Sequence, residues 1–157
     1  MKVEEVIKAE IEELARVNPQ REKELIREVV KRIVELIASK NGRLPYNRHY
    51  LADLGRERES IRSVFTTSRS LVFYHRNLAV WEVSYNELNP TFSRSEEYIT
   101  HPPLIVKYIC RYVDNYEKLT KFLEELVKNL QSLSKYYKSR LGKVIPRLEA
   151  ALKTLSE

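Results

Sequence analysis

The amino-acid sequence predicts a mainly α-helical protein with one β-hairpin and a long C-terminal helix in a coiled coil or bundle. Apolar residues recur every three or four positions over residues 3–17, 21–39 and 105–137, which is the periodicity of amphipathic helices. A cluster of β-branched and aromatic residues over 71–83 is typical of paired strands. The expected domains are an N-terminal domain, residues 1–85, a linker, residues 86–103, and a helical oligomerisation segment, residues 104–157.

The first two helices have recognisable ends. Asn18 suits the cap of the second helix, and Pro19 suits its first position. The second helix carries a wide apolar stripe, so we expect it at the centre of the core. Asn41-Gly42 supplies the left-handed residue that ends this helix.

The next segment predicts two short helices. Pro45 keeps the residue before it extended. A short helix over residues 47–54 then begins at an asparagine, and Gly55 ends it. Residues 57–66 form the following helix, and its apolar face consists of Ile61, Val64 and Phe65.

The strand-like cluster predicts a hairpin. Residues 71–75 and 78–83 form its strands, and Arg76-Asn77 forms a two-residue turn, since asparagine tolerates positive φ. Apolar side chains occupy both faces of this hairpin. Because a hairpin with one face in water alternates apolar and polar residues, we expect both faces to be covered.

The last third of the chain carries a heptad seam with alternating steps of four and three residues. Its apolar stripe is wider than a two-stranded coiled coil needs, and we expect Gly142 and Pro146 to break the helix. Self-association, with a homodimer favoured, is preferred over packing within one chain. The seam residues expected at the subunit interface are Ile109, Tyr112, Tyr116, Leu119, Leu123, Leu126, Leu130, Leu133 and Tyr137.

Charge indicates a polyanionic partner. The net charge is +6, and basic residues gather over residues 43–76 and 128–147. A solvated helix surface is the alternative explanation. No apolar run approaches the roughly 20 residues that span a bilayer, and the single Cys110 excludes an internal disulfide. We therefore expect a cytoplasmic protein, and its abundance of Lys, Arg and Glu suits a thermophile.

The order of elements over residues 21–85 resembles the winged helix-turn-helix family. Leu51-Ala52 looks like the leucine-alanine pair of the family's first short helix, and Gly55 looks like its turn glycine. Ile61 lies six residues beyond that glycine, as in the family, but the step from Ala52 to Gly55 is three residues where four is usual. Dimerising helices after a wing are similar to the layout of PadR-type regulators.

This resemblance implies that residues 57–66 enter the major groove and that the hairpin tip touches the DNA backbone. The arginines around Ser63 should then gather on one convex surface next to the tip at Asn77. Arginine binds guanine through two hydrogen bonds, and hydroxyl or carboxylate side chains also reach bases. The candidate nucleic-acid-binding residues are Arg48, Arg56, Arg58, Glu59, Arg62, Ser63, Thr66, Arg69 and Arg76.

The sequence gives little support for catalysis. Its three histidines, His49, His75 and His101, lack the spacing of metal ligands. We expect no catalytic residue, no cofactor and no bound metal. The alternative is a metal-dependent nuclease in which four carboxylates converge after folding, namely Asp53, Glu57, Glu82 and Glu87.

The function expected from these patterns is that of a dimeric transcriptional regulator that binds duplex DNA. The alternative is a non-enzymatic structural subunit of a nucleoprotein assembly, such as a nucleocapsid protein of an archaeal virus or a small subunit of a CRISPR effector. Both DNA and RNA stay open as partners, and so do a dimer and an open-ended assembly.

Overall fold

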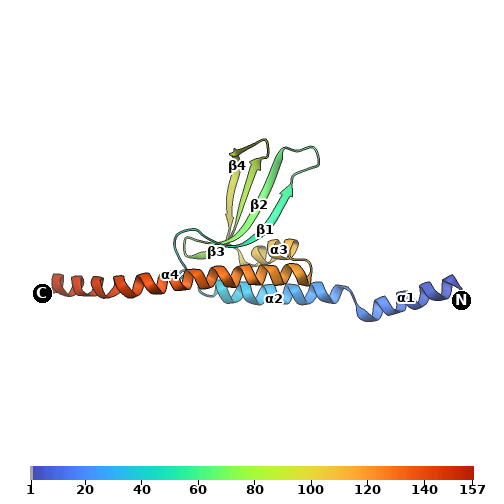
Figure 1. The fold of residues 1–157 in the computed structure, drawn as a ribbon, viewed down its shortest axis with the longest axis horizontal. Coiled ribbons are helices and arrows are strands. Elements are labelled where there is room, and N and C mark those ends of the chain that lie inside the picture. The colour runs from blue at the N-terminus through green and yellow to red at the C-terminus, as the bar shows by residue number, and fades with distance from the viewer. Residues whose placement is uncertain (1) are drawn as a thin grey trace.

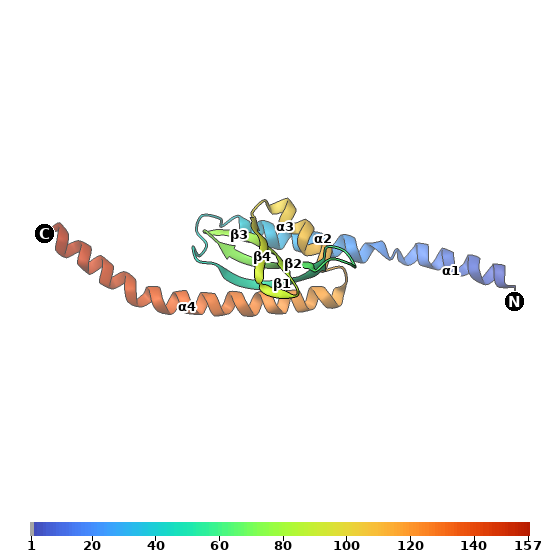
Figure 2. The same ribbon diagram turned by 90° about the horizontal axis from the view of Figure 1, so that it is seen from above.

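The computed structural model describes residues 2–157, except for the side chains of Pro90, Phe92, Ser93 and Arg94. A four-stranded antiparallel sheet has the strand order β1-β2-β3-β4, and one end of it packs on a layer of helices (Figure 1). The first helix and the C-terminal part of the last helix extend from opposite ends of the molecule (Figures 1 and 2). In chain order the elements are α1 (Val3–Val17), α2 (Gln20–Ala38), β1 (His49–Arg58), β2 (Phe65–Tyr74), β3 (Asn77–Asn86), β4 (Asn89–Ile99), α3 (Pro102–Tyr112) and α4 (Tyr116–Ser156).

The helices expected over residues 3–17 and 21–39 are confirmed, but the fold class expected from the sequence is wrong. Residues 47–66 form β1, a loop and the start of β2, not two short helices. β1 and β2 begin a meander of four strands, so the fold mixes α and β structure. The residues expected to form a recognition helix are loop and strand, so the two short helices predicted over residues 47–66 are absent.

Two irregularities in β1 explain why its strand character is hidden in the sequence. The register with β2 shifts between Tyr50 and Ala52 and again between Asp53 and Arg56. Each bulge interrupts the alternation of inward and outward side chains that identifies a strand. Gly55 lies within the second irregularity at φ +84°, a left-handed conformation that suits glycine. This glycine therefore bends a strand, whereas the sequence predicted that it ends a helix.

The expected hairpin is present, with its turn one residue earlier than predicted. Tyr74 pairs with Asn77, so His75 and Arg76 form the turn, with φ of 48° and 71°. A two-residue turn of this kind needs positive φ at both central positions. The hairpin is covered on both faces next to this turn, as expected, and its buried residues are Leu71, Val72, Phe73, Leu78, Ala79 and Val80.

Residues 89–99, which the sequence placed in a linker, form β4. This strand pairs with β3 from Asn89–Asn86 to Ile99–Val80. Its mostly polar sequence gives little indication of a strand. The strand forms through backbone hydrogen bonds to β3, which is already paired with β2. The half of the sheet that contains the β3–β4 turn extends away from the helices (Figure 1).

The predicted C-terminal helix is two helices, and its break lies earlier than expected. α3 ends at Tyr112, and Asn115 caps α4 by accepting a hydrogen bond from the Lys118 backbone N–H at 2.9 Å. α4 continues through Gly142 and Pro146 and bends toward its C-terminus (Figure 2). A proline removes one backbone bond from a helix, which produces a kink more readily than an end. Over residues 2–157, the helices are all too short or too polar to cross a membrane.

Most of the heptad seam packs within the chain. Ile109, Leu119 and Leu126 are buried against α2 and the sheet, and Leu123, Leu130 and Leu133 pack beside them. Tyr112 and Tyr137 are half-buried, and only Tyr116 of the predicted interface residues is largely exposed. Heptad spacing marks an apolar stripe without specifying its partner. Here the partners are the chain's own helix α2 and strand β1.

Side chains of α4 also cover the free edge of β1. The Asn129 side chain donates a 2.7 Å hydrogen bond to the Leu51 carbonyl, and the Asp53 backbone N–H donates to Glu125 at 3.2 Å. The Tyr50 hydroxyl donates to the same carboxylate. Burial and this bond together raise the pKa of Tyr50. These contacts block the edge of β1 against pairing with a further strand.

Candidate functional site

The sheet separates the predicted binding residues into two groups. Arg48 and Arg76 lie at the end of the sheet formed by residues 40–49 and the β2–β3 turn, which we call the proximal end. The opposite, distal end consists of residues 56–68 and 84–95 and includes the β1–β2 loop with Ser63. A ten-residue strand joins the two ends, and this length corresponds to roughly 30 Å. The arginines around Ser63 therefore do not share a surface with the hairpin tip.

At the distal end, several predicted binding residues are bonded to glutamate carboxylates. Arg58 Nη2 lies 2.6 Å from a Glu87 carboxylate oxygen, and the Thr66 hydroxyl also donates to Glu87. These two donors lower the pKa of Glu87, the Thr66 bond first. The Ser63 hydroxyl lies 3.3 Å from a Glu59 carboxylate oxygen and donates to it. Arg58 is thus paired with an acid, while Arg56 and Arg62 are exposed.

Arg69 lies between the two ends and joins the sheet to α3. Its guanidinium donates to Glu82 at 2.7 Å and to Glu57 at 2.9 Å, and it lies 4.7 Å from the ring centre of Tyr108. Burial alone would lower the pKa of Arg69, but the two carboxylates outweigh it and raise that pKa. The Arg69 side chain is 14% exposed. Its role is therefore structural, since its charge is held between carboxylates.

These contacts also decide the arrangement of the four carboxylates in the nuclease alternative. Glu57 and Glu82 converge on Arg69, whereas Glu87 bonds with Arg58, and Asp53 accepts from the Gly55 backbone N–H at 3.2 Å. Within the described part of the chain, no group of three or more His, Cys, Asp or Glu residues is placed to hold a metal ion. The four carboxylates thus bond with arginines or with a backbone N–H group.

Backbone hydrogen bonds assemble the proximal end. The Gly42 N–H donates to the Arg76 carbonyl at 2.8 Å, and the Arg76 N–H donates to the Pro45 carbonyl at 3.1 Å. The His75 N–H donates to the Tyr46 carbonyl at 2.9 Å. These bonds hold the left-handed turn in place and fix the segment before β1 against it. They bring together four exposed cations, namely Lys40, Arg43, Arg48 and Arg76.

Five aromatic side chains form a continuous series that begins at the proximal end and continues toward the middle of the sheet, which we call the aromatic ladder. Neighbouring rings are nearly parallel, with interplanar angles between 6° and 15°. Their centroids are 4.8, 3.9, 3.6 and 6.2 Å apart in the order Tyr46, His75, Tyr74, Tyr98 and Trp81. The ladder begins at Tyr46, which is 58% exposed.

An arginine lies at each end of the ladder. The Arg48 guanidinium lies 3.8 Å from the ring centre of Trp81 and donates to the Tyr98 hydroxyl at 2.8 Å. It also pairs with Glu96 at 3.4 Å. The Arg76 guanidinium lies 5.9 Å from the ring centre of Tyr46 and is therefore beside the exposed end of the ladder. Cations over aromatic rings in this range are attracted by the ring quadrupole.

Part of the second basic zone approaches the same end. A 2.7 Å hydrogen bond joins His49 Nε2 to the Tyr137 hydroxyl of α4. Lys138 directly follows Tyr137, and Arg140 lies three residues after Tyr137. Both cations are therefore close to Tyr137 on the helix. The proximal end thus combines cations from three segments that lie far apart in the sequence.

The ladder was not predicted from the sequence. Its members come from the segment before β1, the β2–β3 hairpin and β4, and only the sheet topology makes them neighbours. The available signal was the aromatic character of Tyr74, His75 and Trp81 in the hairpin. That signal was interpreted as core packing.

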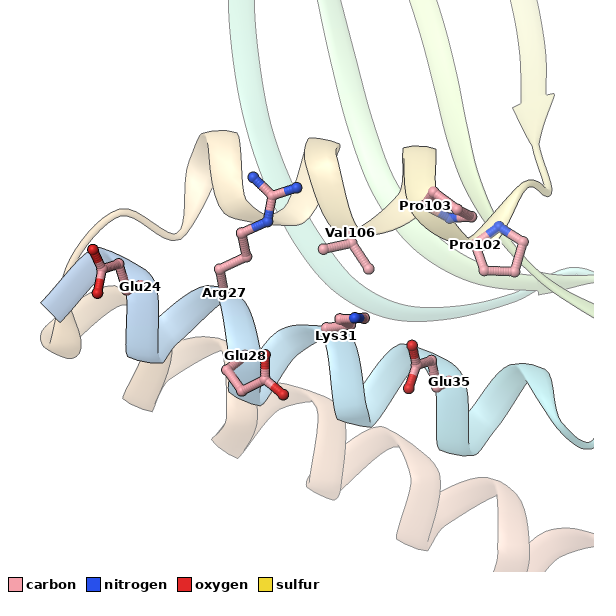
Figure 3. Close-up of a pocket in the computed structure, with 8 residues that line it drawn as sticks. All are labelled: Glu24, Arg27, Glu28, Lys31, Glu35, Pro102, Pro103 and Val106. Carbon is pink, nitrogen blue, oxygen red and sulfur yellow. The ribbon is translucent and has the colours of Figure 1, made fainter. Parts of the chain in front are cut away.

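A separate groove of about 440 Å³ lies between α2 and α3 (Figure 3). Figure 3 shows the Arg27 side chain reaching from α2 toward α3, with Val106 on the α3 side of the groove. Carboxylates outnumber cations along its lining, which disfavours a polyanion there. The lining residues are Glu24, Arg27, Glu28, Lys31, Glu35, Pro102, Pro103 and Val106.

Comparisons with known proteins assign no family. No family model, curated protein or solved structure matches this chain significantly. The proximal end combines exposed cations with the aromatic ladder, and it is the candidate functional site.

Proposed function

We propose that this protein binds nucleic acid, without catalysing a reaction, through the proximal end of its sheet. The observation that carries this proposal is the exposed Tyr46 ring, which ends the aromatic ladder beside Arg76. Cations for phosphates and an aromatic face for bases are the two components of sites that bind single strands.

The cations of the proximal end provide the affinity. Arg43 and Arg76 come from neighbouring segments joined by backbone hydrogen bonds, and both side chains are exposed. Lysine and arginine that neutralise phosphates release condensed counterions, which makes the affinity strongly salt-dependent. Binding of this kind fixes the position of the backbone without reading sequence.

The ladder favours a single strand over a duplex. Tyr46 stacks on His75 with an interplanar angle of 12°, so its orientation is fixed before a ligand arrives. An unpaired base can stack as the next ring of the series, whereas the bases of a duplex already stack on one another. Binding of duplex DNA, the partner expected from the sequence, stays a prediction. Such binding would depend on the cations alone.

Among the two forms of this function, a structural subunit of a nucleoprotein assembly agrees better with the site than a regulator does. A regulator must read base edges, which the winged-helix elements were expected to do. The proximal end offers phosphate contacts and one stacking ring, and these are tolerant of sequence. We therefore expect nucleic-acid binding with little sequence preference.

The test is a binding titration with a fluorescent single strand of about 20 thymidines and with a duplex of equal length at low salt. Because stacking on an aromatic side chain contributes about 1–3 kcal/mol per base, Tyr46→Ala should weaken single-strand binding at least ~5-fold. Tyr46→Phe, which keeps the ring, should bind like the parent protein.

The matched control is Tyr116→Ala, because Tyr116 has a similar exposure but lies at the start of α4, away from the ladder. Equal affinity of Tyr46→Ala and the parent protein for the single strand would refute the role of the ladder. Failure of the parent protein to bind either nucleic acid at low salt would refute the proposed function.

A further inference from the structure

Two helical segments lie outside the core: α1 and the C-terminal part of α4, residues 138–156, which we call the tail. Every residue of α1 is exposed, and in the tail only Val144 is half-buried. The larger apolar side chains are 39% to 69% exposed in α1 and 43% to 83% exposed in the tail. They are Val3, Val6, Ile7, Ile11, Leu14 and Val17 in α1, and Leu141, Ile145, Leu148, Leu152 and Leu155 in the tail.

These exposed residues form stripes of the kind that packs against another helix. In the tail the spacing alternates between four and three residues from Leu141 to Leu155, which is the seam of a coiled coil. Most helical stability in proteins comes from tertiary packing of an amphipathic face. Both segments therefore need a cover that the described part of this chain does not provide.

The two segments have opposite charge. α1 contains five glutamates against Lys8 and Arg16. The tail contains five cations against Glu149. A second α1 would repel α1, and a second tail would repel the tail, whereas α1 and the tail attract each other. The chain thus carries both members of a complementary pair.

The pair cannot form within one chain, because α1 and the tail project from opposite ends of the molecule (Figures 1 and 2). Two chains side by side, related by a two-fold axis across their long direction, place each α1 along the tail of the other. The stripe from Leu141 to Leu155 spans 15 residues, the same length as α1. Both ends are then covered at once, and the arrangement closes as a dimer.

We propose that the occupant of each apolar stripe is a second copy of this chain, with α1 of one copy packed antiparallel on the tail of the other. Successive residues of a helix are rotated by about 100°, which places Glu10 within the α1 stripe and Glu13 at its border. By the same rotation Arg140 and Arg147 lie to one side of the tail stripe, beyond Val144. These four side chains form the complementary charges of the contact. The proposal does not depend on nucleic-acid binding.

Charge reversal tests this contact in the full chain by sedimentation velocity at about 50 µM protein and low salt. The parent protein should sediment as a dimer. The α1 variant Glu10→Arg/Glu13→Arg and the tail variant Arg140→Glu/Arg147→Glu should each dissociate at ~10-fold higher concentration or more, a change that corresponds to about 1.4 kcal/mol. The chain with all four substitutions should again sediment as a dimer, because both charge patterns are then exchanged.

The control variant is Glu5→Arg/Glu12→Arg, which makes the same change of charge on the opposite side of α1 and should leave the dimer intact. Circular dichroism checks that each variant retains its helices. A monomeric parent protein, a four-substitution chain that stays dissociated, or a control as weak as the α1 variant would overturn the contact. Growth beyond a dimer would overturn the two-fold closure.

Discussion

The proximal and distal ends of the sheet both contain several arginines, but the surroundings of those arginines differ. At the distal end Arg58 pairs with Glu87, and Ser63 and Thr66 donate to glutamates. At the proximal end the cations lie beside aromatic rings, and Arg48 pairs with Glu96. The number of arginines in a segment therefore predicts a binding surface poorly. The partners of each guanidinium in the fold decide whether its charge is available to a ligand.

The two ends also differ in how the backbone is held. In the distal part of β1, Gly55 is packed beneath Tyr112 of α3, whereas Gly42 of the proximal segment has open space around it. Both glycines have positive φ. The two glycines thus have comparable backbone geometry, but one is tightly packed and the other is open. Substitution of each by alanine therefore separates the effect of packing from that of backbone conformation.

Gly55→Ala should have the largest effect on stability. A Cβ at this position would lie 2.7 Å from a ring carbon of Tyr112, and φ is +84°. Left-handed backbone costs an alanine about 1–2 kcal/mol, and overpacking adds about 1–3 kcal/mol, so we expect a loss of about 3 kcal/mol. Gly42→Ala should cost only about 1 kcal/mol, the conformational part alone. Urea unfolding of the two variants measures both losses, and equal losses would contradict the packing difference.

Arg69→Ala should destabilise the fold by about 2 kcal/mol, because it leaves Glu57 and Glu82 without their shared partner. The value is below that of a fully buried pair, since Glu57 is 44% exposed. Arg62→Ala in the exposed β1–β2 loop should change stability by less than about 0.5 kcal/mol. Thermal and urea unfolding report both values. A stable Arg69→Ala variant would contradict the structural role of this arginine.

Acid should weaken the distal end through Glu57. Hydrogen bonding from Arg69, followed by the charge of Arg111, lowers the pKa of Glu57 below its ordinary value of 4.5. A lowered pKa in the folded state contributes stability above the unfolded pKa, and this contribution disappears as the pH falls through the folded pKa. The free energy of unfolding should therefore decrease between pH 5 and 3, measured by urea titration. Glu57→Gln should show a shallower decrease, and identical pH profiles would contradict the assignment.

Part of this fold was accessible from the sequence. The first two helices and the hairpin follow from local patterns, namely a period of three to four residues and a cluster of β-branched and aromatic residues. These elements need no knowledge of distant partners. β1 and β4 were missed for different reasons: two bulges remove the alternation in β1, and β4 is polar because the sheet extends away from the helices there.

The candidate site was less accessible than the fold. Arg48 and Arg76 were predicted from charge, and the structure places both beside the aromatic ladder. Tyr46, Tyr74 and Tyr98 meet only because the strands bring distant segments together. The heptad seam of α3 and α4 is a similar case. Leu119 and Leu126 have the spacing of a subunit interface, but they are buried in the core of the chain itself. Spacing identifies an apolar face, whereas the topology determines what covers it.

The most direct test of the account compares charge removal at the two ends. Arg43→Ala/Arg76→Asn removes two proximal cations, with asparagine chosen because it tolerates the left-handed turn. Arg56→Ala/Arg62→Ala removes two distal cations. The measurement is the salt dependence of single-strand binding by fluorescence anisotropy. We predict that the proximal variant binds more weakly and loses about 1 unit of the log affinity against log salt slope per contact removed, while the distal variant retains the parental slope. The reverse pattern would place the binding surface at the distal end and contradict the account.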